Sequence, residues 1–213
     1  DKKANDSLTF DPKALDKLRY LVAQCKARGM YICIDLYASR KPRPGDAIHE
    51  TKKFVRYEMK SLIPMSSSAM NNWKAFAEKF LKTVNPYTGY TWAEEPALYS
   101  LNLINENNLS ANWRNCPEMI PVYEEKFNIF LKKNPIVLPF TRNGRFMQFL
   151  NEVQAGCIAE QIRFLREEVK LKCLITDLNY LNSPAVIPLR EKLDFVDNHQ
   201  YWDHPRFAGK LWA

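Results

Sequence analysis

The chain has 213 residues, of which 46% are hydrophobic, and 31 Lys and Arg against 24 Asp and Glu give a formal charge of +7. This composition is ordinary for a globular domain, and the basic residues are scattered among acidic ones as on solvated helix faces, so we expect no nucleic-acid partner. The six glycines lie at least 12 positions apart, which excludes the glycine-rich phosphate loops of Rossmann, P-loop and kinase-type nucleotide sites.

The first predicted elements are a helix and a strand. Asp11 is suited to cap the helix and Pro12 to begin it, and apolar residues recur at helical spacing until Gly29 ends it. A strand is predicted over 30–37. It is apolar on both faces apart from Asp35, as expected for a strand that is covered on both sides.

A long proline-containing segment separates this strand from the next. Residues 38–66 predict a loop with a short helix, and loops of this length in compact domains are usually functional or disordered. A helix over 68–84 follows, with its aromatic residues on one face. The next predicted strand, 97–104, ends abruptly in the polar run 105–108.

The remaining pattern continues the alternation of helices and strands. Helices are predicted over 117–133 and 145–170, a strand over 171–180, a short helix over 185–193 and a fourth strand over 194–199. Strands separated by helical segments indicate right-handed crossovers and a parallel sheet, hence an α/β fold. Such folds place their binding loops after the strands, and most of the extra length here follows the first two strands.

Polar residues stand at the carboxyl ends of the predicted strands, where parallel sheets gather their functional side chains. The residues in question are Asp35, Tyr37, Asn105, Glu106, Asp177, Asn179, His199, Tyr201 and Trp202. A carboxylic acid in a partly apolar pocket has a raised pKa and can protonate a leaving oxygen. A single Glu after a strand can equally be a helix cap or a surface residue, but Asn105 and the His-x-Tyr run favour a site at Glu106.

Three motifs in this order resemble a known family. GMYICIDLY, ALYSLNLINEN and DFVDNHQYWDHP resemble the third, fourth and sixth strands of clan A glycoside hydrolases related to family five cellulases and mannanases. The resemblance implies a TIM (β/α)₈ barrel of which residues 1–213 are the middle part, about strands three to six of one catalytic domain. It places strands one and two before Asp1, and strands seven and eight after Ala213.

The resemblance also implies roles for individual residues. Glu106 matches the general acid/base, and Asn105 matches the asparagine that binds the sugar 2-hydroxyl. His199 and Tyr201 match residues that orient the substrate and the nucleophile. Trp202 is either a stacking platform or a core tryptophan. Tyr37 and Asn179 are further candidates for substrate binding, and the nucleophilic Glu is expected beyond the chain.

The activity implied in this way is retaining hydrolysis of β-linked glycans, with an oligo- or polysaccharide substrate, and transglycosylation stays open. The alternative is a non-catalytic barrel that binds carbohydrate with the polar residues at the carboxyl ends of its strands but does not cleave it. Polymer-degrading members are usually exported, so the resemblance implies a secreted or periplasmic parent protein. No signal peptide is visible, and since no run of 18 apolar residues occurs we expect no membrane span.

Cysteine and histidine usage gives little support for a metal site or a disulfide framework. The five cysteines include no CxxC pair, and the three histidines form no HExxH pattern. We interpret four of the five cysteines as small buried side chains. The sequence therefore leads us to expect neither a metal nor a cofactor.

Overall fold

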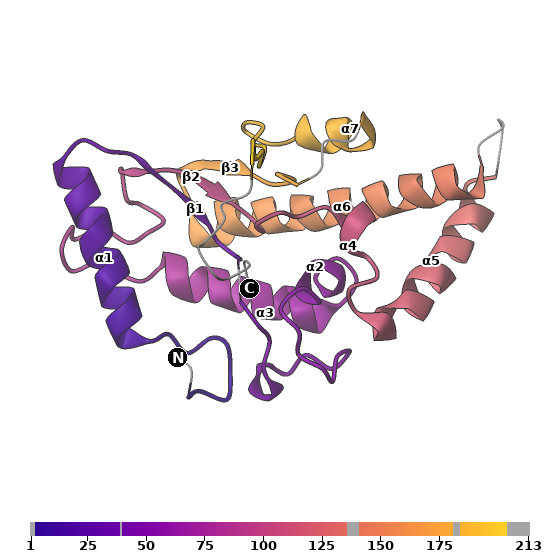
Figure 1. Ribbon diagram of the computed structural model, residues 1–213, viewed down its shortest axis with the longest axis horizontal. Coiled ribbons are helices and arrows are strands. Elements are labelled where there is room, and N and C mark those ends of the chain that lie inside the picture. Colours follow the sequence, from indigo (N-terminus) through magenta and orange to yellow (C-terminus); the bar gives the residue numbers. More distant parts are fainter. Residues whose placement is uncertain (1–2, 39, 136–140, 181–183, 204–213) are drawn as a thin grey trace.

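The computed structural model describes residues 3–38, 40–135, 141–180 and 184–203 of the chain. Three parallel strands form its sheet: β1 (Ile32–Asp35), β2 (Leu98–Asn102) and β3 (Leu174–Thr176), in the order β1-β2-β3 (Figure 1). The parallel direction and chain order of the first three predicted strands are therefore confirmed, although each strand is shorter than predicted.

The register of the sheet separates an apolar row from a polar row. Ile34, Leu101 and Ile175 are partners across the three strands, and Leu101 and Ile175 are buried in the core. One position further along lies the row of Asp35, Asn102 and Thr176. Successive side chains of a strand point to opposite faces, so the two rows belong to opposite faces of the sheet.

The prediction that the first strand is covered on both sides is wrong for the described residues. Asp35 and Cys33 are exposed, whereas Ile34 packs against the core. The polar face of β1 is thus open. The other cysteines are buried or partly buried, and all five are free thiols.

Four longer helices accompany the sheet. They are α1 (Pro12–Ala27), α3 (Ser67–Leu81), α5 (Ile120–Lys133) and α6 (Arg142–Phe164), and α6 continues into a π-helical turn, Leu165–Val169. Side-chain oxygens of Asp11, Ser66 and Thr141 cap α1, α3 and α6 by accepting backbone N–H groups.

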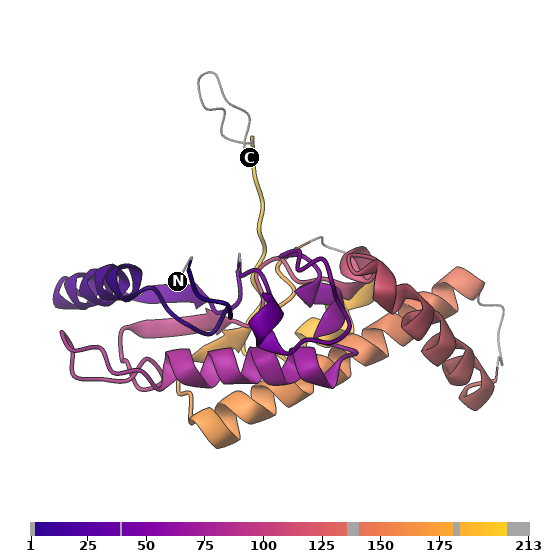
Figure 2. The same ribbon diagram turned by 90° about the horizontal axis from the view of Figure 1, so that it is seen from below.

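Two of these helices, α3 and α6, lie side by side along the sheet (Figures 1 and 2). The Trp73 ring of α3 packs edge-on against Phe164 of α6, with 6.4 Å between ring centroids, and Lys74 forms an ion pair with Glu160. Trp73 is fully buried, and α3, α6 and the apolar row of the sheet share one continuous core.

The segment 38–66 contains short helical pieces, as predicted. A 3₁₀ turn covers Pro44–Asp46 and α2 covers Met59–Leu62. The carboxylate of Asp46 accepts hydrogen bonds from Ser7 and from the backbone of Arg43, which fixes the first half of the segment to the N-terminal residues. After β2 comes α4 (Leu109–Asn112), and a 3₁₀ turn, Pro117–Met119, precedes α5.

The end of the described chain differs from the prediction. The predicted short helix appears as a 3₁₀ turn, Pro184–Val186, followed by α7 (Ile187–Arg190). Residues 194–199 form no strand, so the fourth predicted strand is wrong. The segment runs beside β3, where Asp194 N–H donates to Ile175 O and His199 N–H donates to Asn179 O. Between these points a side-chain bond, Thr176 Oγ1 to Phe195 O, replaces a regular ladder.

Residues 200–203, which follow this segment, extend away from the rest of the molecule (Figure 2). In the part of the chain that the structure describes, no helix has both the length and the apolar character needed to span a membrane.

Candidate active site

Glu106 stands just after β2, and its main chain is held from two sides. Its N–H donates to Asn179 Oδ1 at 2.7 Å, and Lys60 Nζ of α2 donates to its carbonyl oxygen at 2.9 Å. Its φ of 51° lies in the left-handed region, which costs a residue with a Cβ atom energy. Such strain persists only where the surroundings enforce it, as the contacts of Asn179 and Lys60 do here.

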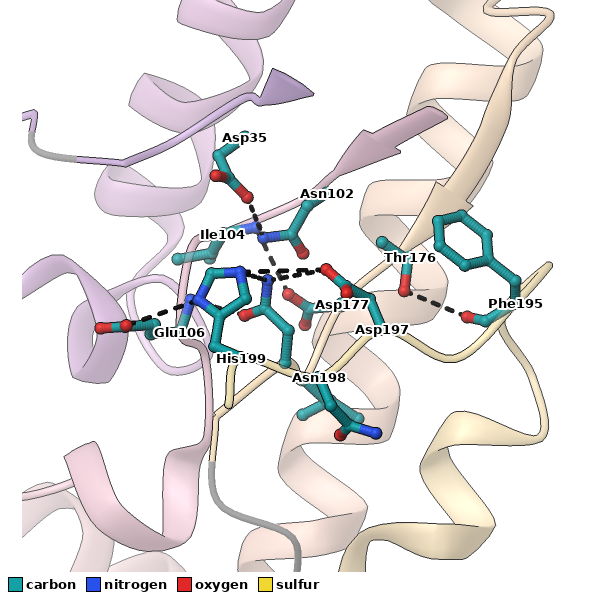
Figure 3. Close-up of polar contacts among 12 residues, drawn as sticks. Asp35, Asn102, Ile104, Glu106, Thr176, Asp177, Phe195, Asp197, Asn198 and His199 are labelled. Carbon is teal, nitrogen blue, oxygen red and sulfur yellow. Dashed lines mark hydrogen bonds and ion pairs between the residues drawn. The ribbon is translucent and has the colours of Figure 1, made fainter. Parts of the chain in front are cut away.

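The ring of His199 faces the carboxylate of Glu106 (Figure 3), and its other nitrogen contacts Asn179. Since Asn179 Oδ1 accepts the Glu106 N–H, the amide nitrogen of Asn179 is the group that faces His199 Nε2, at 3.0 Å. Nε2 must then accept, so the ring proton is on Nδ1, which lies 3.4 Å from Glu106 Oε1. This arrangement directs a histidine N–H at the carboxylate.

A buried carboxyl group lies beneath this chain of contacts. Asp177 has no exposed surface, and its oxygens accept from Ile104 N–H at 3.3 Å and from Asn107 Nδ2 at 2.8 Å. Burial raises the pKa of Asp177 to about 7, although these hydrogen bonds and the charge of Lys60 lower it. Burial also lowers the pKa of Lys60.

A small pocket of about 240 Å³, lined by both polar and apolar residues, opens beside His199 on the face of the sheet that carries Asp35 and Asn102. Its polar lining comes from Asp35, Ser100, Asn102, Thr176, Asp197 and His199. Asn102 Nδ2 donates to Asp35 Oδ1 at 2.6 Å (Figure 3), and Asn179 Nδ2 lies 3.3 Å from Asp197 Oδ2. The pocket therefore offers carboxylate and amide groups that suit a ligand rich in hydroxyl groups.

The structure brings three of the predicted site residues together, namely Glu106, Asn179 and His199. Asn105 is adjacent to them and half-buried, and its N–H donates to the carbonyl oxygen of Tyr37.

The other predicted site residues lie elsewhere. Tyr37 is only 2% exposed, and its ring packs against Phe76, so its place in the core is at odds with a role in substrate contact. Tyr201 and Trp202 lie on the extended segment, where Tyr201 is 59% exposed. Trp202 is fully exposed, so the interpretation of it as a core tryptophan is wrong.

Sequence reasoning missed three residues of this region: Lys60, Asn102 and Asp197. Asp177 was recognised as a polar strand end, but nothing in the pattern indicated that it is buried. Asn102 was within reach of sequence analysis, because its amide is a polar side chain near the carboxyl end of a mainly apolar strand. Lys60 lies in a charged run of the long loop, and no sequence signal points to its contact with Glu106.

Among the described residues, one group of three side chains could hold a metal ion: Glu58, Cys116 and Glu118. It belongs to the loop before α2 and the turn before α5, and contains none of the residues described above.

No protein-family model matches the chain, and no curated protein and no solved structure matches it.

Proposed function

We propose that the chain is part of a glycoside hydrolase that cleaves β-linked glycans with retention, with Glu106 as the general acid/base. The observation that carries the proposal is the fixed carboxylate at the carboxyl end of β2. Its main chain is held by Asn179 and Lys60, its side chain faces His199, and His199 also lines the pocket on the sheet. The barrel, the substrate class and the export of the parent protein are parts of the same proposal.

The proposed reaction uses Glu106 twice. Glu106 in its acid form first protonates the glycosidic oxygen as the bond to the leaving sugar breaks. As a carboxylate it then takes a proton from the water that hydrolyses the glycosyl-enzyme. The nucleophile in this proposal is a glutamate outside the 213 residues, about 5 to 5.5 Å from Glu106 as retaining enzymes require.

The chain's own residues prepare the acid/base for both steps. Asn179 and Lys60 fix the backbone from which the carboxylate projects, so that little reorganisation is needed during the reaction. The Nδ1–H of His199 points to Oε1 and sets the orientation of the carboxyl group. In the proposal, the amide and carboxylate groups of Asn102, Asp35 and Asp197 bind sugar hydroxyl groups in the pocket.

Glu106→Gln tests this role when it is made in the full chain, by which we mean the intact protein that also contains the residues outside these 213. With unactivated β-glycans, kcat should fall by about 10²- to 10⁴-fold, the usual contribution of a general acid. With aryl β-glycosides whose leaving groups need no proton, the first step should be nearly unaffected. The Glu124→Gln variant, which changes an exposed residue of α5, serves as the control. Cleavage of unactivated glycans by Glu106→Gln at the parent's rate would refute the assignment.

The anomeric form of the products tests the stereochemistry separately. NMR spectra recorded early in the reaction should show the β-anomer first if the enzyme retains configuration. If the full chain binds glycans without cleaving any of them, the site belongs to a carbohydrate-binding barrel instead.

A further inference from the structure

We propose that Glu58, Cys116 and Glu118 form a binding site for a divalent transition-metal ion of the zinc class. The proposal is independent of the glycosidase assignment. One ligand atom from each residue lies within 4.8 Å of the other two. The three come from two segments, the end of the loop before α2 and the 3₁₀ turn that precedes α5.

The position of Glu58 is the first reason for a cation here. Its side chain is 99% buried, since only 1% of the residue is exposed. Oε2 accepts from Thr51 Oγ1 at 2.7 Å and from Val55 N–H at 2.9 Å, whereas Oε1 is buried and has no hydrogen-bond partner. A buried carboxylate oxygen without a partner is unfavourable, and a bound cation would satisfy it.

The spacing between Cys116 and Glu118 is the second reason. Cys116 is fully buried, and its Sγ lies 3.4 Å from Glu118 Oε2. A thiolate sulfur and a carboxylate oxygen on one tetrahedral zinc, with bonds of about 2.3 and 2.1 Å, lie about 3.6 Å apart. The pair is therefore already spaced as two ligands of one metal ion.

The Cys116 thiol has a hydrogen-bond partner within the cluster. The thiol donates to Glu118 Oε2 and also lies 3.9 Å from the carbonyl oxygen of Glu50. Metal binding breaks the S–H bond, forms the S–metal bond and releases the proton to solvent. The carboxylate of Glu118 then binds the cation in place of that proton.

The donor set indicates the metal class. One thiolate and two carboxylates suit zinc or cobalt(II) better than magnesium or calcium, which prefer oxygen alone. Glu118 is exposed and leaves a coordination position open to water, so the ion can exchange with solvent. Sequence patterns could not predict this site, because Glu58 is 58 residues away from Cys116 and Cys-x-Glu is no known metal motif.

Cobalt(II) titration of the full chain, dialysed against a chelator, tests the proposal. We expect one equivalent of cobalt to bind with a thiolate-to-cobalt charge-transfer band in the near ultraviolet, and zinc to displace it. Cys116→Ser should abolish the band. Glu118→Gln should weaken binding at least about 10- to 100-fold, which is the usual cost of losing even an outer-shell partner.

Matched variants keep the result interpretable. Cys157→Ser removes another buried thiol, and Glu124→Gln changes an exposed glutamate, so both should bind cobalt as the parent does. If Cys116→Ser fails to fold, Glu118→Gln decides, since its side chain is exposed. The proposal is overturned if the parent binds no cobalt, if Glu118→Gln binds it with the parent's affinity, or if a folded Cys116→Ser keeps the band.

Discussion

The side chain of Asn179 binds the main chain of Glu106: Oδ1 accepts the Glu106 N–H at 2.7 Å, and Nδ2 lies 3.0 Å from His199 Nε2. One carboxamide from the segment after β3 therefore sets both the backbone of the proposed acid/base and the ring that faces its carboxylate. Asn179 is 1% exposed, so water cannot replace these contacts.

Asn179→Ala should therefore affect both stability and the site. Leaving the Glu106 N–H without its buried acceptor should lower the free energy of unfolding by about 1–3 kcal/mol. In the full chain kcat should fall while the substrate's KM changes less, because Asn179 positions the reacting group. Urea unfolding and steady-state kinetics measure the two effects. Asn151→Ala, which removes a single partly buried amide bond to Ala185 O, is the control. An unchanged kcat would show that Asn179 is only structural.

The left-handed backbone of Glu106 should reverse the usual order of stability between an alanine and a glycine variant. At most positions alanine is more stable than glycine, by about 0.5–1 kcal/mol in a helix or strand. At a φ of 51° the order should reverse, because a Cβ atom is unfavourable in this region. We expect Glu106→Gly to unfold at a higher urea concentration than Glu106→Ala, and both to lack activity. If the alanine variant is the more stable one, the left-handed conformation is absent in solution.

Asp177 should make stability depend on pH. Burial raises its pKa to about 7 in the folded chain, so it keeps its proton where an Asp in the unfolded chain, with a pKa near 3.8, has lost it. The folded state then binds more protons, so the free energy of unfolding should fall as the pH rises from about 4 to about 7. The slope contributed by this one group is at most about 1.4 kcal/mol per pH unit.

Asp177→Asn should remove this component of the pH dependence. The amide of Asn107 can rotate to present its Oδ1, which has no partner in the parent, to the new Asn side chain. Urea unfolding of both proteins at a series of pH values gives the difference directly. A constant difference across the pH range would mean that Asp177 is ionised throughout.

Variants of Tyr37 test whether this residue packs in the core or contacts the substrate. Its ring packs on Phe76, and its buried hydroxyl group has no hydrogen-bond partner. Tyr37→Phe should leave the KM of the intact protein unchanged and its free energy of unfolding within about 1 kcal/mol of the unmutated protein, because the ring keeps its packing. Tyr37→Ala should destabilise it by roughly 3–5 kcal/mol through the cavity. If the KM of Tyr37→Phe is ten times that of the unmutated protein, Tyr37 contacts the substrate after all.

The sequence predicted local elements better than the relations between them. The N-cap at Asp11 and the apolar runs of the three strands depend on neighbouring residues, which pattern analysis detects. The prediction of a fourth strand failed because two adjacent apolar residues, Phe195 and Val196, do not reveal whether the backbone finds a regular partner. The contacts of Lys60 and Asp177 join residues more than 40 positions apart, and only the packed fold determines them.

The register of the sheet limits how the chain can change its length. Asp35, Asn102 and Thr176 form one row, and the adjacent row of Ile34, Leu101 and Ile175 faces the other side. Inserting or deleting one residue within a strand would exchange the two faces, so that an amide would enter the core and a leucine the pocket. Changes in length are therefore tolerated between the strands, in segments such as 38–66, where the surroundings of the pocket can vary while its floor stays the same.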